Sequence, residues 1–360
     1  VRKEAYQKYL AQIDESRLYS NYGPLNSLFE RRVLEQYFQG EGALTTVNNA
    51  TIGLMLAICH AKRERGRYAL MPSFTFPATP LAAMWCGLEP YFIDIRDDDW
   101  CMNESILEET LGRLGDQAAC VVTYAAFSTC SNLSRYEALH LDGIPVVIDA
   151  ASSFGSASER GQFGLGFPGP VVFSFHATKS FGIGEGGLVY SGDEDLIRRI
   201  RQAGNFGFSA DRISTMLGLN SKLSEYAAAV ALATLDVFPE KRKIRQRIYQ
   251  WYLEQFSRAG LFSLGWLPQK AQGEIPRQTA SFLCPGGQSN LDHVARLADH
   301  RVESRTYFAP PCHKQPLFSA HPRSDMSVTE DISERVINFP TWEEMGEREV
   351  TKIVFLLAKS

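Results

Sequence analysis

The stretch FSFHATK at residues 173–179, followed by GIGEGG at residues 182–187, decides the fold and the chemistry that we expect. Pro170 to Phe175 has the pattern of a buried strand, and Lys179 lies a few residues beyond its end, beside hydroxyl side chains and a glycine-rich turn. A lysine amine that is removed from water is a good nucleophile towards a carbonyl carbon. A lone lysine near glycines is more often a surface residue, so the argument depends on the segments around it.

Segments typical of strands and helices alternate around this stretch, from about residue 44 to residue 200. The expected helices are at residues 28–38, 51–62, 77–85 and 106–114, and the expected strands are at 67–71, 90–95, 118–123, 144–148, 170–175 and 187–190. This alternation indicates an α/β fold with a largely parallel sheet. Ligands of such folds bind beyond the carboxyl ends of the strands, so the polar residues that follow each strand are the first candidates for a site.

The C-terminal part of the chain has a different pattern. Residues 223–256 read as one long helical region, either continuous or broken at Pro239, where the backbone loses a hydrogen-bond donor. Shorter elements with glycine and proline between them follow. We therefore predict two domains, a large one at residues 1–235 that includes the N-terminal segment and a smaller one at residues 236–360.

Three other strand ends carry suitable polar groups. NNATIG at residues 48–53 runs from a strand end into a helix, whose free amides and positive terminus form a seat for a phosphate, although helix capping explains the same residues. PSFTFPAT at residues 72–79 carries two aromatic rings, of which one can stack on a planar cofactor while the other packs in the core. VVIDAA at residues 146–151 puts Asp149 after a buried run, where a carboxylate needs a partner. A cofactor with a protonated ring nitrogen would be such a partner, and a helix N-cap is the alternative.

The composition is that of an ordinary globular protein, with 44% hydrophobic and 22% charged residues and a formal net charge of -4. No basic stripe predicts a nucleic-acid surface, and no apolar run reaches the roughly 18 residues that a membrane span requires. The first residues lead into polar sequence rather than into a signal peptide. The seven cysteines are dispersed without zinc spacing, so we expect reduced thiols, no metal site and a cytoplasmic location.

Taken in order, these segments resemble the DegT/StrS family of sugar aminotransferases, which depend on pyridoxal 5'-phosphate (PLP). The resemblance covers nearly the whole chain, from NYGPL at residues 21–25, through the lysine stretch and GLNSKLSE at residues 218–225, to FP at residues 339–340. It implies the type I fold of PLP-dependent transferases, that of aspartate aminotransferase. This fold has a large domain with a mostly parallel seven-stranded sheet and a smaller C-terminal α+β domain.

The resemblance also implies a role for each matching residue. Lys179 would form the Schiff base with PLP and move the proton between substrate and cofactor, and Asp149 would pair with the pyridinium nitrogen. Phe76 would stack on the ring. The phosphate would be held by Ala50, Thr51 and Ser174. Asn220 would reach the phosphate bound in the neighbouring subunit of a homodimer.

Three further positions are implied less directly. Ser152 stands where the family usually has Gln or His near the cofactor O3'. Tyr307 and His313 lie in a segment that approaches the sugar nucleotide in relatives. The segment AAFSTCS at residues 125–131 departs from the family's glycine-rich, proline-containing strand end, and it would shape the sugar pocket.

The implied reaction moves an amino group from L-glutamate, through the pyridoxamine form of the cofactor (PMP), to a nucleotide-linked keto sugar. The expected acceptor is a dTDP-4-keto-6-deoxyhexose, which would give a 4-amino-4,6-dideoxy sugar for O-antigen, lipopolysaccharide or a related polysaccharide. A 3-keto sugar is the close alternative. Two more distant alternatives are a desulfurase or β-lyase that uses Cys312 and a non-catalytic regulatory protein that retains the fold.

Overall fold

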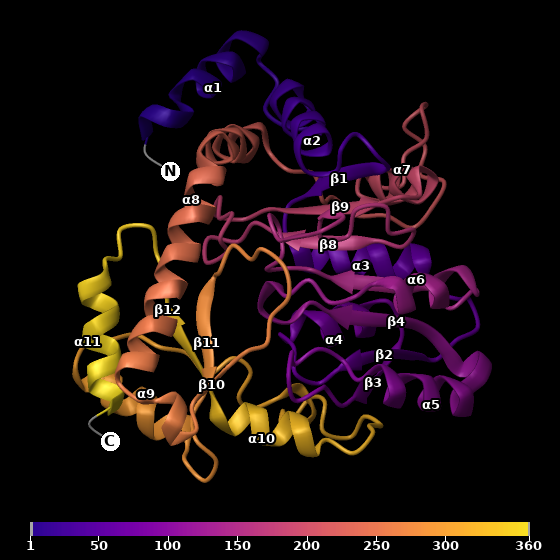
Figure 1. Ribbon diagram of the computed structural model, residues 1–360. Helices are drawn as coiled ribbons and strands as arrows, with labels where there is room; N and C mark the ends of the chain where they lie inside the picture. The colour runs from indigo at the N-terminus through magenta and orange to yellow at the C-terminus, as the bar shows by residue number, and fades with distance from the viewer. Residues whose placement is uncertain (1–2, 359–360) are drawn as a thin grey trace.

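The computed structural model describes residues 3–358, and its centre is a seven-stranded sheet (Figure 1). The order across the sheet is β1-β9-β8-β5-β4-β2-β3, and β9 runs antiparallel to both of its neighbours, whereas the other pairs are parallel. The strands are β1 (Ala43–Val47), β2 (Tyr68–Pro72), β3 (Glu89–Ile93), β4 (Ala118–Tyr124), β5 (Val146–Asp149), β8 (Val171–Ser174) and β9 (Gly187–Ser191). The expected α/β class with a mostly parallel sheet is therefore confirmed.

Helices cover both faces of this sheet, and alternate residues along each strand face opposite layers. On β5, Val146 and Ile148 pack with one hydrophobic cluster and Val147 packs with the other. The first layer contains α1 (Lys3–Ser16), α2 (Pro24–Tyr37), α5 (Glu104–Leu114) and α6 (Ser134–Leu141). The second contains α3 (Ala50–Ala61), α4 (Ala78–Trp85) and α7 (Glu194–Ala203). Burial on both faces explains why the strands read as continuous apolar runs.

The helix α8 (Glu225–Arg258) is continuous through Pro239, so the helix break that we considered at this proline does not occur. Its first half contributes residues as far as Phe238 to the core of the sheet, and Ile248 and later residues belong to a separate core. The Phe238 ring packs at 5.0 Å from the Phe181 ring and 5.7 Å from the Phe154 ring, centroid to centroid. Packing of both halves keeps the helix continuous, although proline removes one internal hydrogen bond.

The second core is built on an antiparallel sheet of order β10-β11-β12, with β10 (Leu267–Pro268), β11 (Thr279–Leu283) and β12 (Val336–Pro340). Around it lie α9 (Asn290–Asp299), α10 (Ser327–Arg335) and α11 (Glu347–Ala358) (Figure 1). A two-stranded hairpin, β6 (Ala157–Ser158) and β7 (Gly161–Gln162), completes the strands. The domain boundary at residues 235/236 stays a proposal; it falls inside α8, and residues 312–326 also pack against the large sheet through Cys312, Phe318 and Met326.

Between residues 3 and 358, none of the helices combines the length and the apolar character needed to cross a membrane.

Candidate active site

The loop that carries Lys179 is folded back on itself by backbone hydrogen bonds between β8 and β9. Phe175 N donates to Gly186 O at 2.9 Å, and Ala177 N donates to Gly184 O at 2.8 Å. A Cβ at Gly182 would lie 2.6 Å from the Ala177 carbonyl oxygen, and Gly184 has φ +105°, so only glycine fits these two positions without strain. The glycine-rich turn therefore fixes the path of the lysine loop.

The amine of Lys179 is partly buried, and its Nζ donates to Gln278 Oε1 at 3.3 Å. Gln278 directly precedes β11, so the second core supplies this contact. Burial lowers the pKa of Lys179, and the carboxylate of Asp149 opposes this effect. A lowered pKa favours the neutral amine, which is the form that attacks a carbonyl carbon.

Asp149 ends β5 and is buried, with 3% of its surface exposed. Thr79 Oγ1 donates to its Oδ2 at 2.6 Å, and Ala151 N donates to its Oδ1 at 3.1 Å. Burial raises the pKa of Asp149, whereas both donors and the Lys179 amine lower it. No helix begins at Asp149, so the alternative of a helix N-cap does not hold. Among residues 3–358 the carboxylate has no ion pair with a basic side chain, so it fits a cationic ring nitrogen.

The start of α3 has the properties of a phosphate seat. Asn49 Oδ1 accepts from Ile52 N at 3.0 Å, which confirms helix capping, yet the amides of Ala50 and Thr51 donate to no other group in the described chain. Gly187 pairs with Ser174 in the sheet, and a Cβ on Gly187 would lie 3.0 Å from Ala50 N. The missing side chain leaves this amide accessible beside the end of β8. Amides at a helix N-terminus bind phosphate well.

The two aromatic residues of the 72–79 segment have different environments. Phe74 is fully buried, and its ring packs at 5.4 Å from the Phe308 ring and 6.3 Å from the Trp100 ring. Phe76 is 58% exposed, directly before α4. One ring thus packs in the core, and the other is free to stack on a planar ligand.

Ser152 and Asn220 lie at opposite extremes of exposure. Ser152 is buried, and its Oγ has no hydrogen-bond partner in the described part of the chain, so this hydroxyl suits a polar ligand atom. Asn220 is exposed in the segment between α7 and α8, which projects beyond the sheet beside α7 (Figure 1). Ser221 O, the next carbonyl, accepts from Asn48 N at 2.6 Å, which ties this segment to the start of α3.

The two residues that we expected near a sugar nucleotide are held by protein groups. Tyr307 is partly buried, and its backbone N donates to Asn338 Oδ1 at 2.9 Å. His313 is 4% exposed, with Nδ1 at 2.7 Å from Ser73 Oγ and Nε2 at 3.1 Å from Glu330 Oε1. Both ring nitrogens of His313 thus have protein partners that hold the segment between α9 and α10, and its contact with a sugar nucleotide stays a proposal.

His176, Glu185 and Cys312 are not part of this arrangement. His176 Nε2 lies 3.7 Å from Glu185 Oε1, and both side chains are exposed. The Cys312 thiol is buried and donates to Thr75 O at 3.3 Å, and burial raises its pKa to about 12. A thiol with this pKa is protonated at neutral pH, which disfavours the alternative of a cysteine-dependent desulfurase.

Sequence reasoning missed two side chains of the site, Thr79 and Gln278. Thr79 was within the quoted 72–79 segment, and a hydroxyl in the first turn of a helix after a strand could have identified it. Gln278 is separated from Lys179 by 99 positions, and no local pattern marks it.

These groups match the chemistry of PLP. The Asp149 carboxylate, which has no ion pair among the described residues, suits the protonated ring nitrogen, the free amides of α3 suit the phosphate, and the Lys179 amine, whose pKa burial lowers, suits the aldehyde carbon. Phe76 suits the ring face. The residues present therefore fit the cofactor that the sequence implied.

Comparison with known proteins agrees with this arrangement. The model of the DegT/DnrJ/EryC1/StrS aminotransferase family matches residues 1–358. The chain is 32% identical to protein Rv3402c of Mycobacterium tuberculosis (strain ATCC 25618 / H37Rv), over 95% of this chain and 84% of that protein. It is 47% identical to a putative PLP-dependent aminotransferase from Bacillus cereus ATCC 10987, whose crystal structure superposes with a TM-score of 0.98 over 99% and 97% of the two chains. The structure of DesI with its TDP-sugar product has a TM-score of 0.90 at 30% identity, over 100% of this chain and 90% of DesI.

Proposed function

The chain belongs to the DegT/DnrJ/EryC1/StrS aminotransferase family and is a PLP-dependent sugar aminotransferase, and on this basis we propose that it transfers an amino group from L-glutamate to a nucleotide-linked keto-deoxy sugar. The observation that carries the proposal is that a partly buried amine and a buried carboxylate lie at neighbouring strand ends. Lys179 follows β8 with a lowered pKa, and Asp149 ends β5 with a raised pKa and no basic partner among the described residues.

The roles of the side chains follow from their positions. PLP supplies an electron sink when it is bound. Lys179 Nζ takes and returns the proton at the substrate carbon, and Gln278 holds this amine in place. Asp149, oriented by Thr79, keeps a negative charge at the ring nitrogen. Phe76 would stack on one face of the ring.

Other residues would hold the ends of the ligands. The amides of Ala50 and Thr51 and the Ser174 hydroxyl would hold the phosphate, and the Ser152 hydroxyl, which has no partner in the described chain, would donate to the cofactor O3'. We propose a homodimer in which the exposed Asn220 reaches the phosphate in the neighbouring subunit, and a cytoplasmic location for the enzyme. Tyr307 stays our proposed contact to the sugar nucleotide.

A dTDP-4-keto-6-deoxyhexose is our proposed acceptor, and its product would be a 4-amino-4,6-dideoxy sugar for O-antigen or another polysaccharide. Two comparisons support it, the DesI structure with a TDP-sugar product and an Escherichia coli dTDP-4-amino-4,6-dideoxy-D-glucose transaminase at 26% identity. A 3-keto acceptor is the second candidate. It is favoured by a UDP-N-acetyl-3-dehydro-alpha-D-glucosamine 3-aminotransferase of Acidithiobacillus ferrooxidans at 27% identity.

The test is an absorbance spectrum of the purified protein with PLP, recorded before and after L-glutamate is added. We expect a visible band that is lost on addition of glutamate in the wild type and is absent from Lys179→Ala. The glutamate-treated enzyme is then mixed with a dTDP-4-keto sugar in one sample and with a UDP-3-keto sugar in another. The sugar that restores the visible band of the cofactor is the amino acceptor. A protein without the band would be a regulatory scaffold, and release of sulfide from cysteine would identify a desulfurase.

A further inference from the structure

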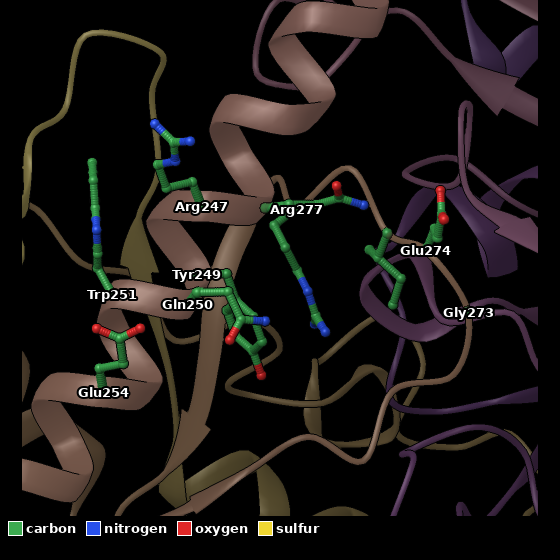
Figure 2. A pocket seen from close by; sticks show the side chains of 10 residues that line it. Arg247, Tyr249, Gln250, Trp251, Glu254, Gly273, Glu274 and Arg277 are labelled. Carbon is green, nitrogen blue, oxygen red and sulfur yellow. The ribbon is translucent and has the colours of Figure 1, made fainter.

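A cleft of about 640 Å³ lies between the second half of α8 and residues 273–277, which lead to β11 (Figure 2). Its lining includes Tyr249, Trp251 and Arg277, and none of the side chains assigned above to the cofactor or the substrate. The neighbouring residue Gln278 contacts Lys179, whereas Arg277 extends toward Tyr249 of α8. The cleft is therefore a feature separate from the candidate active site.

Arg277 is a buried cation without an acidic partner. It is 9% exposed, its guanidinium lies 3.9 Å above the centroid of the Tyr249 ring, and its Nη1 is buried without a hydrogen-bond acceptor. Throughout residues 3–358, its guanidinium forms no ion pair. Burial lowers the pKa of Arg277, and only the Tyr249 hydroxyl opposes this effect. An unpaired buried charge destabilises a fold, so the arrangement calls for an anion.

The acidic side chains around the cleft are already paired with other cations. Glu274 Oε2 lies 3.3 Å from Arg242 Nη2, and Glu254 Oε2 lies 3.7 Å from Arg258 Nη2. Beyond the cleft, Glu343 pairs with Arg245 at 2.9 Å. None of these carboxylates forms an ion pair with Arg277.

We propose that this cleft is a binding site for a small oxyanion, a carboxylate or a phosphate, with Arg277 as its anchor. Because the Tyr249 ring covers one face of the guanidinium, an oxyanion would approach its N–H edge, where the buried Nη1 has no acceptor. Arg247 and Gln250, both exposed, add a second cation and an amide donor to the lining. A bound anion fixes the backbone that carries Gln278, so occupancy of the cleft acts on the partner of the catalytic lysine.

The proposal is tested by calorimetric titration of the PLP-loaded enzyme, in which the cofactor fills the phosphate seat at α3. Inorganic phosphate and succinate are titrated separately, which distinguishes the two sources of oxyanion. We expect saturable binding of one anion per chain, and Arg277→Gln should weaken it at least about tenfold, the loss of one charge-assisted contact. Arg247→Gln removes the same charge from an exposed position of the cleft and should weaken binding less than about threefold.

The visible band of bound PLP shows that each variant is folded, and it makes this test independent of the proposed acceptor. If Arg277→Gln fails to fold, a crystal of the wild-type holoenzyme soaked in selenate gives the same answer through anomalous density at the guanidinium. Absence of saturable binding of both anions, or equal affinity in wild type and Arg277→Gln, would overturn the proposal. A carboxylate of a second copy seated on Arg277 in that crystal would also overturn it.

Discussion

The hydrogen bond from Thr79 to Asp149 is the contact whose removal tests the site most directly. Thr79 and Asp149 are both buried, and the Oγ1–Oδ2 distance is 2.6 Å. Thr79→Val has nearly the same shape, so it removes the donor without leaving a cavity. A hydrogen bond to a charged group contributes about 1.5–3 kcal/mol, and each 1.4 kcal/mol is a factor of ten. If the bond serves to orient and stabilise the carboxylate at the ring nitrogen, the variant should transaminate about 10- to 150-fold more slowly.

The assay is the single-turnover loss of the visible cofactor band after L-glutamate is mixed with PLP-loaded enzyme. Thr75→Val is the matched control, because Thr75 Oγ1 lies 3.0 Å from Thr79 Oγ1 and makes no contact with Asp149. The control removes a buried threonine hydroxyl from the same chain of hydrogen bonds and should change the rate less than about threefold. A Thr79→Val rate within threefold of wild type, or an equally slow Thr75→Val, would refute a positioning role for Thr79. The melting temperatures of the two variants should be similar, which separates this role from general destabilisation.

Three further predictions concern stability and cofactor affinity. Burial raises the pKa of Asp149 above its ordinary 3.8, so the folded protein loses stability as pH rises through this pKa and the carboxyl group becomes charged. In differential scanning fluorimetry, cofactor-free Asp149→Asn should therefore melt at a higher temperature than wild type at pH 8, and the difference should shrink towards pH 4. A difference that does not change with pH would contradict this reasoning. Gly187→Ala puts a methyl group 3.0 Å from the first amide of α3, so it should weaken PLP binding about tenfold in equilibrium dialysis. The control Gly112→Ala adds a methyl group that meets no atom within 4 Å, so it should leave the affinity for PLP unchanged. Glu225 accepts from two buried amides at the start of α2, at 2.7 and 2.9 Å, and Glu225→Ala should lower the free energy of unfolding in urea by about 2–4 kcal/mol, against less than about 0.5 kcal/mol for the exposed Glu240→Ala.

The sequence was most informative at the strand ends. Hydrophobic runs and the residues that terminate them are local properties, so the strand before Asp149, the capped helix after Asn49 and the glycine-rich turn after Lys179 were predicted close to their positions in the structure. Fold class followed from the alternation of these elements. The roles assigned to the site residues stay predictions, because they rest on the family pattern.

The features that could not be predicted depend on contacts between distant segments. Pro239 did not break α8, since packing of both helix halves outweighs one missing hydrogen bond. The contact of His313 Nδ1 with Ser73 Oγ joins residues 240 positions apart, and the role of His313 towards a ligand stays a prediction. The contact of Gln278 with Lys179 likewise depends on how the second core meets the sheet. No window of sequence contains such information.

The continuous α8 makes the geometry around Lys179 depend on the curvature of a single helix. One end of α8 is packed into the core that carries Lys179 and Asp149, and the other end into the core that carries Gln278. A change in the angle between the two cores therefore bends α8, and it also shifts the buried contacts of Phe74 and Trp100 with Leu283 and Val336, which join the large sheet to the second core. Pro239 marks the position where such a bend is cheapest, because one backbone hydrogen bond is already absent there. The stiffness of this helix near its middle therefore resists any change in the distance between the Gln278 amide and the Lys179 amine.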